Sequence, residues 1–301
     1  MSEPVPADPL GLDASARKAT PVDLDPGAPP PAAFAAVAAE CVDHWRTNEA
    51  MLLTSRAAPH LHQTRVGIRR LRSAFSLFHP VLRDIPDARP VAHRLRALAL
   101  PLGPARDLDV LLSGPLAAPL TEHQRARLLE EREGAYDTVV AVLRSPEWAA
   151  AGRDLDDLLG SMPTSAGTGA LDGLARTALA HRAGRVTRAD GRLEQMSAAD
   201  RHSVRIEAKK LRYGCEFLAA LFPAAEPRVT DDDGTELVGA LAYARLAEDV
   251  QTALGALNDH ATADSLLHRV GASAPAVDEA ELLTEGVTAV HRLAEAPRFW
   301  T

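Results

Sequence analysis

The chain has 301 residues, of which 46% are hydrophobic and 25% are charged. This composition is typical of a soluble protein with one large or two medium-sized domains. No apolar run approaches the roughly 20 residues that a membrane-spanning helix needs, and no signal peptide opens the chain, so we expect a cytoplasmic protein with no membrane partner. The only cysteines are Cys41 and Cys215, which excludes a disulfide framework and a cysteine-ligated metal site.

Arginine dominates the basic residues, because the 33 cationic side chains include only three lysines. A guanidinium presents a planar fork of donors that fits the oxygens of phosphate or carboxylate. The formal net charge is −8, yet residues 50–83 hold six arginines and no acidic residue, and residues 176–212 hold ten basic residues against four acidic ones. Such segregation indicates a protein that attracts anions at one place and repels them elsewhere.

In chain order, the first predicted element is a disordered tail over residues 1–31, which hold eight prolines and little apolar periodicity. The three prolines at its end, Pro29 to Pro31, are suited to begin a helix. Beyond them the apolar spacing is helical throughout. The predicted helices cover residues 32–53, 59–78, 88–100, 104–112, 119–143, 146–159, 171–189, 198–222, 236–257, 261–270 and 277–295.

Prolines and glycines separate these helices, most clearly between Pro101 and Pro104. Ser197, with an acid three residues later at Asp200, predicts an N-cap for the helix over 198–222. No alternating run rich in β-branched residues interrupts the helical pattern. The sequence therefore predicts an all-α fold.

An internal repeat relates the two basic segments. The stretch from His62 (HQTRVGIRRLR) returns at His202 as HSVRIEAKKLR, with four of eleven positions identical and three conservative. A second marker, LGPARD from Leu102, is echoed in the same order by LGALND from Leu254. Two markers in one order indicate an internal duplication. We expect a single domain over 32–301, whose halves, 32–160 and 171–301, are pseudo-symmetric helical bundles joined by a linker over 161–169 with a basic groove or pore between them.

Each repeat gathers its basic residues on one helix face, within an arc of about 80° at 100° per residue. We call these rows the first basic stripe, which is His62, Arg65, Arg69 and Arg72, and the second basic stripe, which is His202, Arg205, Lys209 and Arg212. Apolar residues occupy the other side of each helix and predict its packed face.

The stripes can be read as solvated helix faces or as a ligand site. Solvated faces usually mix charge signs, because like neighbours three or four residues apart cost about 0.2–0.5 kcal/mol each. In the first stripe, successive members are like-charged neighbours at this spacing, and no acidic residue lies within the helix. An anionic ligand would relieve this repulsion, so we favour a binding site.

Five further basic residues are candidates for the same site. Arg70 and Lys210 lie in the repeats but off the stripes. Arg185 and Arg188 share one face of the helix over 171–189, where a solvated face is an equal alternative. Arg106 follows Gly103 at a helix junction, where capping or an inter-helix hydrogen bond is the alternative role.

Catalytic and metal-binding signatures are absent from the sequence. There is no phosphate-binding glycine loop, no dinucleotide fingerprint, no Gly-x-Ser-x-Gly elbow and no carboxylate pair beside a nucleophile. On a helix, His60 and His62 would point about 200° apart, and no further ligands complete a metal site. Aromatic residues are not interleaved with the basic ones, so base stacking is poorly supported. We expect no metal and no cofactor.

The motifs together resemble the CHAD family, the conserved histidine α-helical domain. The resemblance rests on HxxRVxxRRLR from His62, LGxxRDxD from Leu102 and HxxRIxxKKLRY from His202, and covers about residues 32–301. It implies an all-helical domain of two pseudo-symmetric bundles around a basic pore or groove. Family members bind inorganic polyphosphate, and some are targeted to polyphosphate granules. The pore positions of the family correspond here to the two basic stripes.

The resemblance does not imply an enzyme, because the chain lacks the β-rich triphosphate tunnel domain and the Glu-x-Glu-x-Lys motif that often accompany this family. The chain also departs from the pattern in the second half, where Asn258 stands at the position of Arg106. Glu216 follows the second stripe and either weakens it or positions an arginine. The Pro-rich tail has no counterpart.

The sequence thus predicts a non-catalytic module that binds inorganic polyphosphate, associated with polyphosphate granules in the cytoplasm. A linear polyanion offers only acceptor oxygens, and rows of guanidinium, lysine and histidine donors complement it. The alternatives are a phosphoesterase or phosphotransferase acting on phosphorylated substrates, a nucleic-acid backbone binder, and a scaffold whose tail recruits a protein partner. Nucleic acid is the less favoured ligand because aromatic stacking platforms are missing.

Overall fold

Helices make up nearly all of the regular structure in this computed structural model, which describes residues 8–163 and 171–301. In the first half they are α1 (Pro30–Ser55), α2 (Ala58–Leu77), α3 (His79–Leu82), α4 (Ala88–Ala99), α5 (Gly103–Ser113), α6 (Glu122–Leu143) and α7 (Pro146–Gly160). In the second half they are α8 (Leu171–Thr187), α9 (Ala198–Leu218), α10 (Gly239–His268) and α11 (Glu279–Glu295). The prediction of an all-α fold is confirmed. Within the described ranges, no helix is long and apolar enough to span a membrane.

Local sequence signals set several helix starts. The Ser197 hydroxyl accepts a hydrogen bond from the backbone N–H of Asp200 at 3.1 Å, which confirms the predicted N-cap of α9. Thr121 and Gln124 form a reciprocal capping box at the start of α6. Prolines occupy the first two positions of α1, where their missing N–H groups are not needed.

Two elements of the second half differ from the prediction. The start predicted for a helix at Glu236 is instead strand β2 (Glu236–Val238), which pairs antiparallel with β1 (Arg228–Thr230). Three-residue strands are too short to show a period of two, so the pattern missed them. The two helices predicted over 236–257 and 261–270 are one helix, α10, because the position that corresponds to Pro101 is Ala253, and no proline interrupts this stretch.

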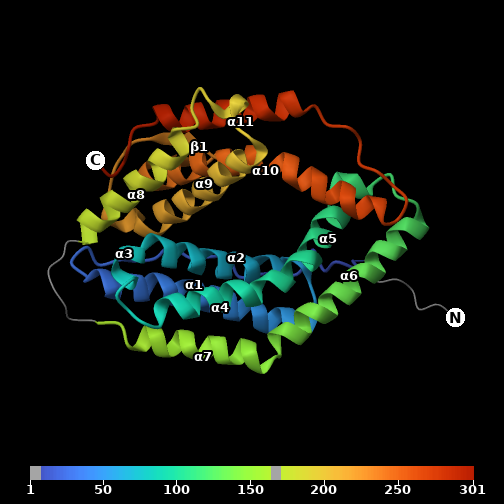
Figure 1. Cartoon of the computed structure of the whole chain (residues 1–301), viewed down its shortest axis with the longest axis horizontal. Helices are drawn as coiled ribbons and strands as arrows, with labels where there is room; N and C mark the ends of the chain where they lie inside the picture. The colour runs from blue at the N-terminus through green and yellow to red at the C-terminus, as the bar shows by residue number, and fades with distance from the viewer. Residues whose placement is uncertain (1–7, 164–170) are drawn as a thin grey trace.

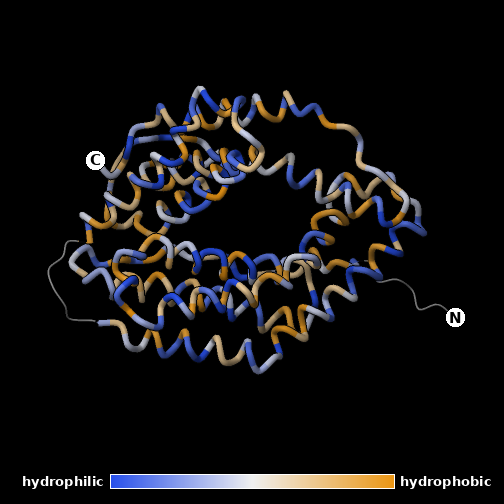
Figure 2. Tube along the Cα trace, in the orientation of Figure 1, coloured by the Kyte–Doolittle hydropathy of each residue, from blue (hydrophilic) through white to orange (hydrophobic). Residues whose placement is uncertain are grey.

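The helices form two groups (Figure 1). Helices α1 to α4 and α7 lie together, α8 to α11 lie on the other side with the β1–β2 hairpin, and α5 and α6 connect the groups at one end. Helices α2 and α9 pack against each other where the groups meet. Along each helix hydrophobic and hydrophilic residues alternate at short intervals (Figure 2), as expected for helices with one packed face.

Most of the hydrophobic core is one continuous cluster that draws on both groups of helices. A smaller cluster joins α5, α6 and the end of α10 and includes Leu108, Leu128 and Leu267. The linker predicted over 161–169 lies mostly outside the described residues, between the end of α7 and the start of α8.

Residues 8–29, which we call the N-terminal segment, differ from the disordered tail expected for residues 1–31. Leu10, Val22 and Leu24 are buried, and the backbone N–H of Ala58 donates to the carbonyl of Leu10 at 2.9 Å. His60 also bonds through Nε2 to a backbone carbonyl of this segment, at Ser15. Apolar residues spaced along a proline-rich stretch therefore anchor it without helical periodicity. Residues 1–7 lie outside the described residues.

Candidate anion-binding site

The contact of α2 with α9 brings members of both stripes to one place. Gly67 allows α1 to approach the opposite face of α2 closely, because a Cβ there would lie 2.8 Å from the backbone nitrogen of Trp45. With that face packed, the stripe side of α2 is turned towards α9. Arg69 of α2 and Lys209 of α9 line the same cleft.

This cleft, which we call the basic cleft, has a volume of about 850 Å³. Helix α2 contributes His62, Arg69 and Arg70, and α9 contributes Lys209, Arg212 and Glu216. Helix α10 and residues 18–23 of the N-terminal segment complete the lining. The two stripes thus converge, at least through their central members, instead of lying on opposite outer surfaces.

Arg69 and Lys209 line the basic cleft, and they belong to a group of five neighbouring cations that have no carboxylate within salt-bridge distance among the described residues. We call them the unpaired cluster: Arg65, Arg69, Arg72, Arg106 and Lys209. The Nε atoms of Arg65 and Arg69 are buried and have no hydrogen-bond partner within residues 8–163 and 171–301. Unsatisfied buried donors of this kind are costly, and here they belong to two neighbouring arginines of the first basic stripe.

Burial, and in addition the charges of neighbouring cations, lower the pKa values of four of these residues, which are Arg65, Arg72, Arg106 and Lys209. Burial lowers the pKa of Lys209 to about 8, and the charges of Arg69, Arg205 and Arg72 add to this. Burial lowers the pKa of Arg65 to about 10, with Arg69 adding to the effect. Burial also lowers the pKa of Arg106, opposed by Asp109 and reinforced by Arg69. Arg69 is thus the common neighbour, and a bound anion would stabilise every member in its charged form.

Two candidate cations that line the cleft, Arg70 and Arg212, are matched with carboxylates instead. Arg70 is buried and contacts Glu216 through Nη1, with Glu40 3.6 Å away. Arg212 donates to Glu216 from Nε at 3.0 Å and lies 2.6 Å from Glu248 through Nη1. Glu216 therefore positions two arginines, one from each half, and the cleft is more nearly neutral at this end.

Helix α8 contributes to the contact between the halves and not to the basic cleft. Arg182 donates to Glu207 at 2.7 Å and, through Nη2, to the carbonyl of Ser76 at 3.1 Å. The Nζ of Lys210 donates to the same Glu207 at 2.8 Å. Of the two predicted residues on α8, Arg185 lies 3.5 Å from Glu207 through Nε. Lys210 and Arg185 therefore belong to an ion-pair network around one buried carboxylate, which the pattern of positive charges alone could not reveal.

Arg188, the other predicted residue of α8, is exposed at the end of the helix and does not line the basic cleft. The structure thus does not bring it to the stripes. The spacing that placed Arg185 and Arg188 on one face of α8 is also the spacing of a solvated face, and both side chains are exposed.

The two halves present parallel arrangements around the stripes. Arg65 lies beside Gly103, and Arg205 lies so close to Gly255 that a Cβ there would meet its guanidinium at 2.9 Å. Burial lowers the pKa of His62, and the nearby charge of Arg106 adds to this. His202 lines a small pocket with Asn258, the counterpart of Arg106. Only the first-half histidine lines the basic cleft, since His202 is exposed near the start of α9, seven residues before Lys209.

Sequence reasoning missed two basic residues near the site. Arg96 of α4 is exposed, and its charge helps to lower the pKa of Arg72, whose largest cause is burial. Lys18 lines the basic cleft from the N-terminal segment. Arg96 lies three residues after His93 and seven after Arg89, a one-face spacing that could have flagged it. No local pattern marks Lys18, because its position depends on long-range packing.

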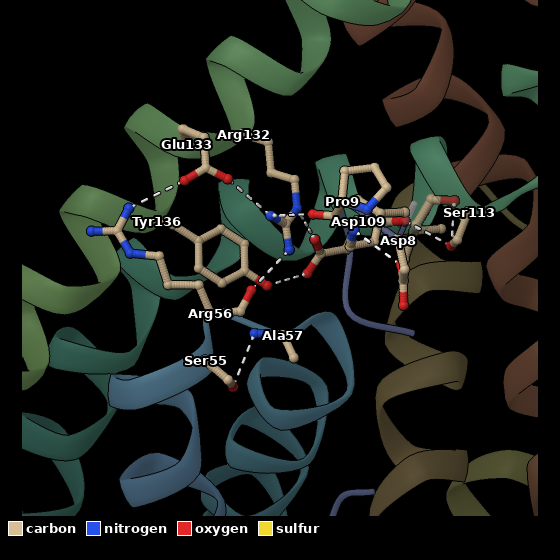
Figure 3. Close-up of polar contacts among 12 residues, drawn as sticks. Asp8, Pro9, Ser55, Arg56, Ala57, Asp109, Ser113, Arg132, Glu133 and Tyr136 are labelled. Carbon is tan, nitrogen blue, oxygen red and sulfur yellow. Dashed lines mark hydrogen bonds and ion pairs between the residues drawn. The ribbon is translucent and has the colours of Figure 1, made fainter. Parts of the chain in front are cut away.

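A buried ion pair fixes α5, which carries Arg106, to its neighbours (Figure 3). Asp109 is fully buried and accepts hydrogen bonds from Nε of Arg132 at 2.7 Å and from the Tyr136 hydroxyl at 2.8 Å. The Nη2 of Arg132 donates to the carbonyl of Arg56 at 3.0 Å, and its Nη1 to that of Pro9 at 3.4 Å. One guanidinium thus ties α5, α6, the end of α1 and the N-terminal segment together.

Comparisons with known proteins agree with this architecture. The solved CHAD domain from the plant Ricinus communis is 25% identical, with a TM-score of 0.69, over 93% of this chain and 89% of that one. PptA from Streptomyces chartreusis has a similar fold, with 14% identity and a TM-score of 0.50 over 91% and 93% of the two chains. No curated protein matches. The family model of the CHAD domain matches residues 36–268, and the chain therefore belongs to the CHAD domain family.

Proposed function

We propose that this protein binds inorganic polyphosphate, without catalysing a reaction on it, through the unpaired cluster and the basic cleft. Polyphosphate binding is a known property of the family. The observation that carries the proposal here is the convergence of five unpaired cations, two of them with buried unsatisfied Nε atoms. A row of phosphates supplies the acceptors and the negative charge that this region lacks. In cells that store polyphosphate, such binding would place the protein on the granules.

We also infer that the two halves derive from an internal duplication around a basic pore. The parallel pairs Arg65 with Gly103 and Arg205 with Gly255 support this, because each joins the first marker of a half to its second marker. Asp259 extends the parallel, since it lies 3.8 Å from Arg205, and its counterpart Asp107 has a pKa that burial raises and Arg65 lowers. Equivalent contacts at equivalent spacing are unusual for unrelated helices.

A titration with polyphosphates of defined length at about 50 and 200 mM salt tests the proposed function. Each cation that neutralises a phosphate releases a counterion from the polyphosphate. Because several cations do so, we expect the logarithm of the binding constant to fall with the logarithm of the salt concentration with a slope of roughly −3 or steeper. Calorimetry or fluorescence anisotropy provides the measurement. Absence of binding at the lower salt concentration would overturn the proposal.

The same assay separates the alternative functions. Single-stranded DNA or RNA at equal phosphate concentration should compete weakly, because residues that could stack on bases are scarce around the cleft. Incubation of polyphosphate with Mg²⁺ and the protein should release no phosphate. Tighter binding of nucleic acid would favour the backbone-binding alternative, and steady phosphate release would favour a phosphoesterase.

The affinity should fall as the pH rises above about 8. Lys209 has a pKa lowered to about 8, chiefly by burial, and a bound polyanion stabilises its protonated form. Below pH 8 the ammonium is already charged, whereas above it binding must take up a proton, so affinity should drop by up to about tenfold per pH unit. His62, with a pKa of about 4, stays neutral over this range.

Isothermal titration between about pH 7 and pH 9.5 in buffers of different ionisation enthalpy measures this proton uptake. The matched control is Lys209→Arg, which keeps the charge and removes the titration, so its affinity should stay level over this range. An equal decline in the wild type and in K209R would show that Lys209 is not the titrating contact.

A further inference from the structure

The N-terminal segment supplies one wall of the basic cleft. Residues 18–23 line the cleft together with Arg69 and Lys209 from the two stripes. These residues precede the match to the family model, which begins at residue 36. Both stripes lie within that match, so the family resemblance assigns no binding position to this wall.

Contacts on both sides of Lys18 fix the segment in place. The buried Asn48 accepts a hydrogen bond from the backbone N–H of Arg17 at 3.1 Å and donates to its carbonyl at 3.0 Å. Beyond Lys18, the backbone N–H of Thr20 donates to Glu40 at 2.9 Å, and Val22 is buried in the main core. The backbone at Lys18 is therefore held as part of the fold, which reduces the entropy lost when its side chain binds a ligand.

The side chain of Lys18 has a free ammonium group. It is exposed, and its ammonium has no hydrogen bond or ion pair among the described residues, whereas the adjacent Arg17 is paired with Asp43 at 2.7 Å. Arg69 and Lys209 line the same cleft as this segment. Lys18 thus adds a positive charge from a third element to a space already bordered by unpaired cations.

The position of the N-terminal segment divides the basic residues of α2 between two sides of that helix. At 100° per residue, His62, Gln63 and Arg70 lie on the side of α2 that faces the N-terminal segment, and all three line the basic cleft. Arg65 and Arg72 lie on the other side, next to the charges of Arg106 and Arg96 respectively. Arg69 lies between these two sides of α2.

We propose that Lys18 is a ligand-contacting residue and that the N-terminal segment is a wall of the site, which holds a linear polyphosphate against Arg69 and Lys209. The proposal rests on the proposed function and extends it to residues outside the family match. The recognised groups are phosphate oxyanions, which an ammonium binds as a point charge. A chain held at Arg69 then reaches Lys18 in one direction and the cations beside α4 and α5 in the other.

The substitution Lys18→Glu tests this contact. We expect the dissociation constant for a polyphosphate of defined length to rise roughly five- to tenfold, because one attraction is replaced by one repulsion. The matched control is Arg127→Glu, which makes the same charge change at an exposed, unpaired position of α6 outside the cleft lining. It should alter the constant less than about twofold. Equal effects of K18E and R127E would overturn the proposal, since only net charge would then matter.

Limited trypsin digestion gives a second, independent measurement. Polyphosphate should protect the bond after Lys18 in the wild type but leave cleavage after Arg127 unchanged. Cleavage after Lys18 at the same rate with and without bound polyphosphate would overturn the proposal that the N-terminal segment is a wall of the site. Failure of the wild type to bind polyphosphate would instead overturn the proposed function, so the two failures are distinguishable. Unchanged melting temperatures would show that K18E and R127E are folded.

Discussion

The double substitution Arg69→Glu with Lys209→Glu should abolish measurable polyphosphate binding and leave the helix content intact. Both side chains line the basic cleft, one from each half, and neither has a carboxylate partner in residues 8–163 and 171–301. Each charge-assisted contact contributes about 1.5–3 kcal/mol, so losing two of them costs about 3 kcal/mol or more, which is at least a hundredfold in affinity. The new carboxylates add repulsion to that loss.

The folded state should tolerate this change well. The wild-type cations repel one another, and this repulsion adds to the burial that lowers the pKa of Lys209 to about 8. Replacing two of its cations by anions creates attractive neighbours for Arg65, Arg72 and Arg106, so the melting temperature should hold or rise. Circular dichroism and thermal denaturation check the fold, and the polyphosphate titration checks binding.

A matched control makes the same change of net charge away from the site. Arg127→Glu with Arg153→Glu replaces two exposed cations of α6 and α7 that have no ion-pair partner in the described part of the chain. Its affinity should stay within about threefold of the wild type at physiological ionic strength, because exposed charges beyond a Debye length are screened. Tight binding by R69E/K209E would contradict the assignment of the site to the two stripes.

Much of this arrangement could be predicted from the sequence, because helical periodicity and charge spacing are local properties. The row from His62 to Arg72 has no acidic residue within its helix, and its three arginines, Arg65, Arg69 and Arg72, have no ion-pair partner in the described part of the chain. The central positions Arg69 and Lys209 are those that the structure brings together. Helix capping at Ser197 was likewise readable, since it needs only two nearby residues.

The remaining features depend on contacts between distant segments. Whether a stripe arginine is free or paired depends on carboxylates far along the chain, as Arg70 and Glu216 illustrate across 146 positions. The N-terminal segment packs by isolated anchors such as Leu10 and Leu24, which carry no period to detect. The uninterrupted α10 shows a further limit of prediction from a repeat. A repeat predicts which positions are equivalent, but local residues such as proline decide whether a helix continues at those positions.

Among the residues that support the site, Asp109 should be the one whose substitution most lowers the stability of the fold. Replacing Asp109 by Ala should lower the free energy of unfolding by about 3–5 kcal/mol, because it leaves the guanidinium of Arg132 buried with only the exposed Glu133 as a counter-charge. The Tyr136 hydroxyl loses its acceptor at the same time. Urea denaturation followed by circular dichroism measures the change. An exposed ion pair offers the contrast, since Arg94→Ala, which removes the contact with Asp154, should cost less than about 1 kcal/mol.

A second variant separates the loss of the charge pair from the loss of volume. Asp109→Leu combined with Arg132→Met replaces both ions by apolar groups, and it should recover most of the stability that Asp109→Ala loses, because no unpaired charge stays buried. The recovered protein still lacks the bonds from Arg132 to the carbonyls of Arg56 and Pro9. Its N-terminal segment should therefore be cut by trypsin faster than that of the wild type, even where the unfolding energies agree. A D109A variant as stable as the wild type would show instead that Arg132 finds another partner on α6, with Glu133 the nearest carboxylate at 3.1 Å.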